Sequence, residues 1–425
     1  MRFADAVADL EARQPERMVP DLARITAVAT LLGDPQLLYP SIHVTGTNGK
    51  TTTARIVTSL ACRHGIGAGL YTSPHLLSVT ERFEVCATPI SEREFADEYE
   101  RLMPVLEQVD GRGERVTYFE VLTALAYLWF ADKPVDAGVF EVGMGGLWDA
   151  TNLVRGEVAV VGEIGLDHPE LGSTLEEVAG EKAGIIKHGR SVVCREQPPE
   201  AMKVIQARCE EMEARLLLEG RDYEVVDRRR AIGGQAMAIR GLRGTYDELF
   251  LPLFGEHAAR NAGAAVAAFE AFLDRPLDEG LVREALAEVS SPGRLQIVGR
   301  RPMVVLDGAH NPAGARALAA ALVEEFVWKR LHLVIAVSAN KDLGGILSAL
   351  APLADRAYAA RNDSSRAGEA EAVEIDLAQR DVPVERFNSV AAAIAAARES
   401  AGEDDAILVT GSLYTVADAR RALGT

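Results

Sequence analysis

The sequence of 425 residues contains few aromatic residues and few basic ones relative to its acidic residues. Aromatic residues make up only 6% of it, so it shows no sign of a stacking surface for single-stranded nucleic acid. Lys and Arg (45) are outnumbered by Asp and Glu (63), which gives a formal net charge of −18. The basic footprint that DNA or RNA requires is therefore missing, and an anionic substrate would need a local positive site.

Cysteines and long apolar runs are scarce as well. The four cysteines (Cys62, Cys86, Cys194 and Cys209) form no CxxC pair and lie at no zinc-finger spacing from a histidine. We therefore expect four reduced thiols in a cytoplasmic protein. No apolar stretch approaches the roughly 18 residues of a membrane helix, and the acidic N-terminus lacks the apolar core of a signal peptide. We predict a cytoplasmic monomer with neither a membrane nor a nucleic-acid partner.

Strand-like and helix-like segments alternate along the chain, which is typical of parallel sheets covered by helices. In the first part we expect strands at 41–45, 135–142 and 157–164, and helices at 51–64, 118–131 and 174–187. The region 221–253 contains two Gly-rich turns and is expected to form a β-rich excursion from this first domain.

The alternation starts again near residue 303. Here the expected strands are 303–306, 331–337, 356–359 and 406–410, and the expected helices are 312–326, 343–350, 391–399 and 416–423. The preceding segment Ser290–Arg294 (SSPGR) carries the Pro and Gly of a hinge. We predict an α/β protein with two domains: a P-loop-containing parallel-sheet domain over residues 1–295 and a smaller Rossmann-like domain over residues 296–425.

A glycine-rich loop, Thr45–Thr52 (TGTNGKTT), joins the first predicted strand to the next helix. Glycines let backbone N–H groups turn toward phosphate oxygens, and the helix N-terminus adds partial positive charge. In such a loop Lys50 can reach the β- and γ-phosphates of ATP, and the Thr51 hydroxyl is placed for Mg²⁺. The usual first glycine, five residues before Gly49, is replaced by Val44. We predict that this loop binds ATP.

The loop resembles that of the Mur ligase superfamily, and further motifs narrow the resemblance to the folylpolyglutamate synthase/dihydrofolate synthase family. These motifs follow the family's order from about residue 40 to 415: YTSPHL at 71–76, ERF at 81–83, TYFE at 117–120, EVGMGGLWDATN at 141–152, LDH at 166–168, EKAG at 181–184, PGR at 292–294, DGAHNP at 307–312 and GS at 411–412. The resemblance implies a Mur ligase-like fold, with a central-type ATP-binding domain followed by a glutamate ligase domain. It also implies an ATP-dependent amide ligase of folate and one-carbon metabolism that adds L-glutamate to folates, and to dihydropteroate in bifunctional members.

The same resemblance implies a set of metal ligands. Glu141 ends a buried strand, where a carboxylate is costly unless it meets a cation, and His168 follows the end of the next strand. Parallel strands place both of these strand ends at one rim of the sheet. The resemblance implies that Glu141 and His168, together with Ser73, hold a Mg²⁺ ion, for which the loop also places Thr51. A capped loop histidine is the alternative for His168 taken alone.

Lys182 lies in a helix rich in Glu, where a surface lysine in a salt bridge is the simplest interpretation. In the family the matching lysine is carbamylated, which makes it an oxygen ligand suited to a second Mg²⁺. The resemblance therefore implies ATP and two Mg²⁺ ions as cofactors, with Lys182 among the metal ligands and catalytic residues.

Further residues are assigned to ATP and to glutamate by the resemblance. The ATP-binding set is Asn48, Gly49, Lys50, Thr51, Asn261 (near the adenine), Arg294 and Asp307. His310 is expected beside the reacting carboxylate and the incoming amine, as a catalytic residue together with Lys50 and Lys182. Strand-end caps and turns would account for Asn311, but they explain Arg294 and His310 poorly. Ser412 and Tyr414 are weaker candidates for binding glutamate.

Phe119, Glu120 and Asp149 match positions that hold the pterin in bifunctional relatives. Phe119 and Glu120 also begin an apolar helix, so core packing and charge at a helix N-terminus explain them nearly as well. This chain departs from the family at Leu147, where the family has Arg, and in the stretch His168–Gly172, which is one residue shorter. Neither departure touches the predicted catalytic residues, so any effect is expected on rate and substrate choice.

Two other functions are compatible with the loop alone. A cell-wall-type ligase would act on a UDP-linked substrate, but only about forty residues precede the loop, too few for the UDP-binding domain of such ligases. A P-loop ATPase without ligase activity would hydrolyse ATP independently of glutamate and folate, and it gives no reason for Glu141, His168 and Lys182. We hypothesise a ligase in which Lys50 and Mg²⁺ neutralise the γ-phosphate while a carboxylate attacks it, forming an acyl phosphate that the amine of glutamate resolves. Domain closure would keep water from that intermediate.

Overall fold

The computed structural model describes residues 1–15, 19–113 and 115–425. The chain forms two compact units, which we describe separately. The first comprises Met1–Arg229, Ala236–Leu251 and Arg260–Val289, and the second comprises Arg230–Gln235, Pro252–Ala259 and Ser290–Thr425. The domain boundary predicted at residues 295 and 296 stays a prediction.

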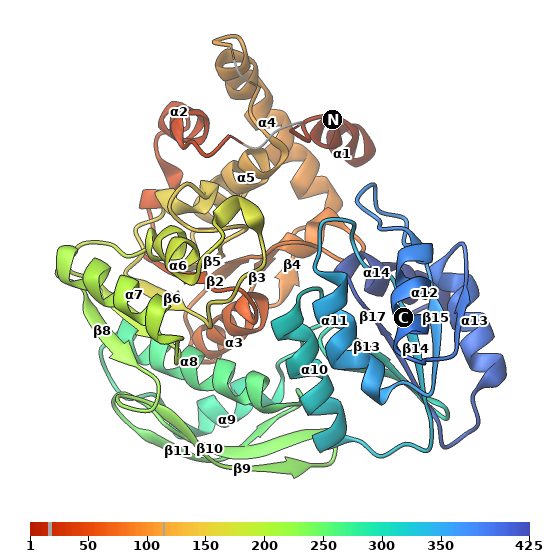
Figure 1. Cartoon of the computed structure of the whole chain (residues 1–425). Helices are drawn as coiled ribbons and strands as arrows, with labels where there is room; N and C mark the ends of the chain where they lie inside the picture. Colours follow the sequence, from red (N-terminus) through yellow and green to blue (C-terminus); the bar gives the residue numbers. More distant parts are fainter. Residues whose placement is uncertain (16–18, 114) are drawn as a thin grey trace. The chain divides into compact units, whose positions relative to one another are not determined.

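An eight-stranded sheet forms the centre of the first unit (Figure 1). Its strands are β1 (Ser41–Thr45), β2 (Ala68–Tyr71), β3 (Phe83–Val85), β4 (Thr88–Pro89), β5 (Ala137–Glu141), β6 (Val158–Val161), β7 (Ser191–Cys194) and β8 (Arg215–Leu218). They lie in the order β4-β3-β2-β5-β1-β6-β7-β8, and only the β2–β3 and β3–β4 pairs are antiparallel. Every residue of β1, β5 and β6 is buried, as expected for parallel strands covered by helices on both faces.

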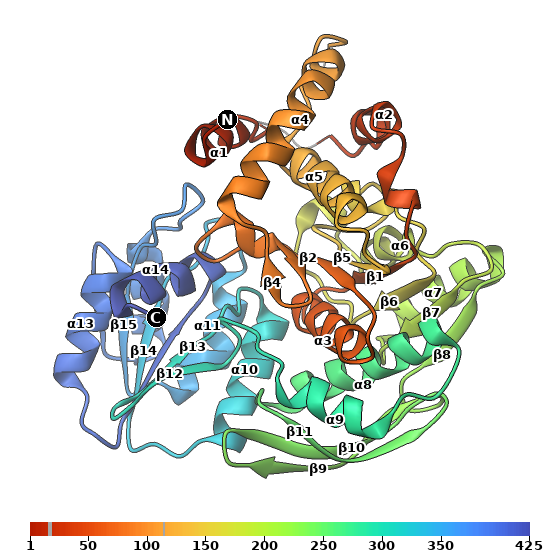
Figure 2. The ribbon, with the colours of Figure 1, turned by 180° about the vertical axis from the view of Figure 1, so that it is seen from behind.

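The helices of this unit lie on both faces of the sheet, with α5 on one face and α3 on the other in Figures 1 and 2. Their bounds are α1 (Phe3–Glu11), α2 (Ala23–Leu31), α3 (Lys50–Arg63), α4 (Glu92–Asp110), α5 (Tyr118–Asp132), α6 (Leu175–Ala183), α7 (Pro199–Glu211), α8 (Glu256–Leu273) and α9 (Glu279–Ala287). Residues 256–259 of α8 belong to the second unit. The apolar helix α5 is buried almost throughout and begins with a capping box between Thr117 and Glu120. The helix expected at 174–187 ends early, at Ala183.

The β-rich excursion predicted for residues 221–253 is confirmed. It is a three-stranded sheet with the order β11-β10-β9, made of β9 (Glu224–Ala231), β10 (Gly234–Arg240) and β11 (Thr245–Leu251).

The second unit holds a six-stranded sheet with the order β12-β13-β17-β14-β15-β16. Its strands are β12 (Gln296–Arg300), β13 (Met303–Leu306), β14 (Leu331–Ile335), β15 (Arg356–Ala359), β16 (Val384–Arg386) and β17 (Ala406–Thr410); its helices are α10 (Pro312–Glu325), α11 (Leu343–Leu350), α12 (Ala370–Gln379), α13 (Val390–Ser400) and α14 (Leu413–Leu423). Only β12 runs antiparallel to its neighbour. The predicted fold class, a parallel-sheet domain followed by a smaller α/β domain, is confirmed.

The expectation of four reduced thiols is wrong. Cys62 and Cys86 form a disulfide, whereas Cys194 and Cys209 are free and buried. Cys62 lies in the last turn of α3 and Cys86 in the turn between β3 and β4, and 24 positions separate them in the sequence. No spacing motif marks this pair, because it is the fold that brings the helix end and the hairpin turn together.

Among the residues that the structure describes, no helix combines the length and the apolar character needed to cross a bilayer.

Candidate active site

The glycine-rich loop leaves the carboxyl end of β1, at the edge of the sheet where β5 and β6 also end. The loop lies tightly against the turn after β6, because a Cβ atom at Gly46 would be 3.0 Å from the Cα of Gly162. Thr47 ties the two segments together: its N–H donates to the carbonyl of Glu163 (2.9 Å), and its hydroxyl accepts from the N–H of Gly165 (2.8 Å). The loop is therefore braced by the neighbouring strand end.

Two lysines converge on one carbonyl oxygen of this loop. Lys50 Nζ lies 3.1 Å and Lys182 Nζ lies 2.9 Å from the oxygen of Gly46. Lys182 is only 4% exposed, which excludes the surface salt bridge considered for it. Burial, together with the charge of Lys50, lowers the pKa of Lys182 to about 7, against the opposing effect of Asp167. Lys182 thus has an uncharged amine far more often than an ordinary lysine at neutral pH.

Glu141 connects the loop to the strand beside it. Its side chain is buried (2% exposed); Oε1 accepts from the Thr51 hydroxyl at 2.8 Å, and Oε2 accepts from the N–H of Ser73 at 3.1 Å. The structure therefore brings together three of the predicted metal ligands. Mg²⁺ usually takes one or two carboxylates and completes its shell with phosphate oxygens and water, so this hard oxygen set fits Mg²⁺.

His168 is 34% exposed in its side chain and lies after β6, where it precedes the short 3₁₀ turn Pro169–Leu171. Its Nε2 is 3.6 Å from a carboxylate oxygen of Asp167, and its Nδ1 is 3.9 Å from Glu170. Across the described residues, no three His, Cys, Asp or Glu side chains gather as a ready-made metal cluster. Asp167 was not predicted as a site residue, although it stands next to His168 and its side chain is only 5% exposed.

Asn261, the predicted adenine neighbour, lies on α8 against the loop. A Cβ atom at Gly49 would stand 2.6 Å from its Nδ2, and the φ of +79° at Gly49 also favours glycine. The Oδ1 of Asn261 accepts a hydrogen bond from Arg195, at 2.9 Å. Arg195 was missed in the sequence, where its only signal is a charged residue directly after a buried apolar strand.

Asp149 lies at the start of the 3₁₀ turn Ala150–Leu153, after β5, and is buried. Its carboxylate accepts from the N–H of Met144 (2.9 Å) and from both the N–H and the hydroxyl of Thr151. Burial raises the pKa of Asp149, and these hydrogen bonds oppose that effect. The hydroxyl of Thr151 is also 2.8 Å from Nε2 of His43, a buried histidine whose pKa burial lowers to about 3. The sequence analysis missed His43.

Phe119 and Glu120, in the first turn of α5, have different surroundings. The ring of Phe119 covers Gly143, where an added Cβ would lie 2.5 Å from the ring, and it packs at 6.1 Å from the ring of Tyr71. Glu120 is buried; it accepts from the Thr117 hydroxyl in the capping box and pairs with Arg24 at 3.1 Å. Structural contacts therefore account for Glu120, and its predicted role toward a substrate stays a prediction.

In the second unit, the predicted residues meet at the carboxyl ends of β13 and β17, which are neighbouring parallel strands. Asp307 is buried and accepts from the N–H groups of Leu295 and Ala309, each at 2.8 Å. Burial raises the pKa of Asp307, while the charge of Arg294 acts in the opposite direction. His310 Nδ1 lies 2.8 Å from the carbonyl oxygen of Gly308.

Asn311 and Ser412 of this unit cap helices. Asn311 caps α10 by accepting from the N–H of Gly314 at 2.7 Å, which agrees with the cap considered for it in the sequence. Ser412 is buried and caps α14, accepting from the N–H of Tyr414 at 3.2 Å, whereas the Tyr414 side chain is exposed.

Comparisons with known proteins agree with this arrangement. Residues 44–269 match the Mur ligase middle domain, and residues 293–413 match the glutamate ligase domain of Mur ligases. The chain is 40% identical to the dihydrofolate synthase/folylpolyglutamate synthase of Mycobacterium tuberculosis, covering 98% of this chain and 92% of that protein. It is 35% identical to the enzyme of the same name from Escherichia coli, covering 95% and 92%.

Solved structures show the same similarity. The Mycobacterium tuberculosis folylpolyglutamate synthase complexed with ADP superposes with a TM-score of 0.96 at 39% identity, covering 100% of this chain and 98% of that one. Escherichia coli FolC in complex with DHPP and ADP gives a TM-score of 0.90 at 32% identity, covering 100% and 98%.

Proposed function

Because this chain belongs to the folylpolyglutamate synthase/dihydrofolate synthase family of Mur ligases, we propose that it joins L-glutamate to folates in an ATP-dependent reaction. The observation that carries this proposal is the braced loop with Lys50 and Thr51, whose hydroxyl donates to the buried Glu141 at 2.8 Å. A related protein is known in complex with ADP, which supports ATP as the nucleotide. The cytoplasmic location and monomeric state expected from the sequence stay predictions.

The first step activates a carboxylate. A carboxylate oxygen of the folate attacks the γ-phosphorus of ATP, the bond to the β-phosphate oxygen breaks, and ADP leaves. Lys50 lies at the loop carbonyl of Gly46, from which its ammonium can turn to the β- and γ-phosphates. Thr51, Ser73, Glu141 and His168 would hold Mg²⁺, which supplies further neutralisation of phosphate charge. Asn48 and the N–H groups around Gly49 would hold the phosphates.

Lys182 is proposed to act as a carbamate. Its pKa of about 7 makes the neutral amine, the form that reacts with CO₂, abundant at physiological pH. A carbamate would replace the buried amine by oxygen ligands beside the loop. These oxygens would suit a second Mg²⁺ ion. In its charged form, an unmodified Lys182 would leave two ammonium groups facing one carbonyl oxygen.

The second step forms the amide. The amine of L-glutamate attacks the acyl phosphate carbon, the carbon–oxygen bond breaks, and inorganic phosphate leaves. His310 is proposed to take the proton from the attacking amine: if its Nδ1–H donates to the Gly308 carbonyl, Nε2 is the basic ring nitrogen. Arg294 and Asp307 are proposed to bind ATP, and Ser412 and Tyr414 the glutamate.

Dihydropteroate is a second candidate substrate for the same chemistry. The ring of Phe119 over Gly143 and the buried carboxylate of Asp149 would suit a flat heterocycle that carries hydrogen-bond donors. A related protein known in complex with DHPP and ADP supports this possibility. Glu120 completes the proposed pterin-binding set.

The direct test incubates the purified protein with ATP, L-[¹⁴C]glutamate and either tetrahydrofolate or dihydropteroate. We expect a labelled folate product and ADP in equal amounts with at least one of the two acceptors. ADP release without labelled product would point to the alternative of an ATPase that does not ligate, and a product only with other carboxylates would point to a different Mur-type ligase.

A further inference from the structure

Arg195, which directly follows β7, is a buried cation that the proposed chemistry does not use. Its side chain is 4% exposed. Nη1 donates to the Oδ1 of Asn261 at 2.9 Å, and Nε lies 3.6 Å from Oε2 of Glu219. A buried guanidinium is costly unless its partners compensate the loss of water, so these contacts hold the group in place.

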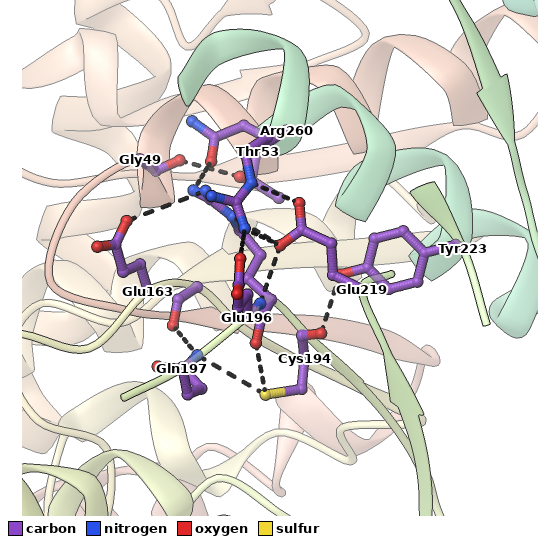
Figure 3. Close-up of polar contacts among 12 residues, drawn as sticks. Gly49, Thr53, Glu163, Cys194, Glu196, Gln197, Glu219, Tyr223 and Arg260 are labelled. Carbon is purple, nitrogen blue, oxygen red and sulfur yellow. Dashed lines mark hydrogen bonds and ion pairs between the residues drawn. The ribbon is translucent and has the colours of Figure 1, made fainter. Parts of the chain in front are cut away.

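Glu219 is itself held firmly (Figure 3). Arg260 donates to both of its carboxylate oxygens, at 2.7 and 2.8 Å, and also to Glu196 at 2.9 Å. Burial alone would raise the pKa of Glu219, but the hydrogen bond from Arg260 and the charge of Arg195 lower it overall. The carboxylate is therefore ionised at neutral pH and forms an ion pair with Arg195, whose Nε lies 3.6 Å away.

The contact with Arg195 fixes the orientation of the Asn261 amide, that is, which side carries the oxygen and which carries the nitrogen. A guanidinium carries only donors, so the atom facing it must be the amide oxygen. The amide NH₂ group is then directed away from Arg195, and the amide as a whole lies against the loop, since a Cβ at Gly49 would stand 2.6 Å from Nδ2 and 2.8 Å from Oδ1. Gly49 belongs to the loop whose N–H groups are proposed to hold the phosphates.

We propose that Arg195 is a positioning residue of the nucleotide site. It holds Asn261 so that the amide presents an N–H donor, rather than its oxygen, to a nucleotide bound at the loop. The ligand this favours is a purine nucleotide with an acceptor, such as a ring nitrogen, at that point. The inference rests on the proposed function, which makes this loop the ATP site.

The test measures ADP binding by calorimetry and the KM values for ATP and glutamate. Asn261→Asp keeps an oxygen for Arg195 but removes the donor, and Arg195→Met removes the group that orients the amide. We expect each change to weaken ADP binding and raise the KM for ATP about tenfold, as for the loss of one hydrogen bond, and to leave the KM for glutamate unchanged.

Arg13→Met is the matched control, because Arg13 is also buried and paired, with Asp9 and Asp110, at contacts that involve neither Asn261 nor the loop. It should lower thermal stability without changing the affinity for ADP. In an Asn261→Ala background, Arg195→Met should cause no further loss of ADP affinity. Unchanged ADP binding in Arg195→Met, or the same loss with and without Asn261, would overturn the inference. Failure of the unaltered protein to bind ADP would instead overturn the proposed function.

Discussion

Glycine is required at position 49 for two reasons: its backbone conformation and the space taken by Asn261. The two effects can be measured separately. The φ of Gly49 is +79°, and an added Cβ would also meet the amide of Asn261. Gly33 has a similar φ of +81°, but nothing lies within 4 Å of its missing Cβ. We expect Gly33→Ala to cost about 1 kcal/mol of unfolding free energy and to leave activity intact.

Gly49→Ala should show that same loss and, in addition, a rise in the KM for ATP of tenfold or more, because Asn261 must move. Urea unfolding and steady-state kinetics of the two variants give the comparison. Equal KM values for ATP in both would mean that the contact with Asn261 has no part in nucleotide binding.

Lys182 should lower the free energy of unfolding, because its proposed function requires a buried amine. With a folded pKa of about 7 against an ordinary value near 10.4, the unfolded chain holds the proton more tightly. The penalty is therefore fully present below pH 7 and declines as the pH rises from 7 toward 10. We expect Lys182→Met to gain roughly 1–3 kcal/mol at pH 6.5 in CO₂-free buffer, after allowing for the lost hydrogen bond, and little at pH 10.

The same variant should lose ligase activity. Lys187→Met is the control, since burial also lowers the pKa of Lys187, to about 8, while its ammonium donates to both side-chain and backbone oxygens of Asn152 rather than to the loop. Lys187→Met should change stability and keep activity. A Lys182→Met protein that is less stable than the unaltered one at pH 6.5 would contradict this account of the buried amine.

At the scale of elements, the Cys62–Cys86 disulfide joins the end of α3 to the β3–β4 hairpin. Cys86 and Ala87 in the hairpin turn both have positive φ, 45° and 62°, which is unfavourable for residues with a side chain. Closing a loop of this length should contribute about 3 kcal/mol by restricting the unfolded chain.

We therefore expect dithiothreitol to lower the Tm of the protein by several degrees. Replacing Cys62 and Cys86 by Ser should give the lower Tm directly and abolish the response to dithiothreitol. Replacing the buried free thiol Cys209 by Ser should leave the response in place. A Tm that is independent of dithiothreitol in the unaltered protein would show that the bond does not stabilise this region.

The elements predicted from sequence were those with clear apolar patterns. The strands 303–306, 356–359 and 406–410 and the helix 343–350 have the predicted bounds. The helix predicted to reach Lys187 ends at Ala183, where the carbonyl of Glu181 accepts from the N–H of Leu147 at 2.8 Å, and Gly184 packs so closely against Leu147 that an added Cβ would lie 2.4 Å from its backbone. Such a contact between distant segments leaves no periodic signal.

The same limit applies to the site. The grouping of Lys50, Thr51 and Glu141 at one edge of the sheet could be predicted because motifs at strand ends mark these residues. Arg195 and His43 contact partners 66 and 108 positions away, so only the fold shows what they touch. The disulfide was missed for the same reason.

At the scale of the whole molecule, the central claim is that ATP serves to make an acyl phosphate on the acceptor carboxylate. The most direct measurement uses an acceptor folate whose reacting carboxylate is labelled with ¹⁸O, together with ATP and L-glutamate, and determines the mass of the phosphate released. We expect one ¹⁸O atom in each phosphate, in step with the amide formed, because the carboxylate oxygen leaves with the phosphorus. Phosphate that contains no ¹⁸O, although ADP is produced, would contradict it.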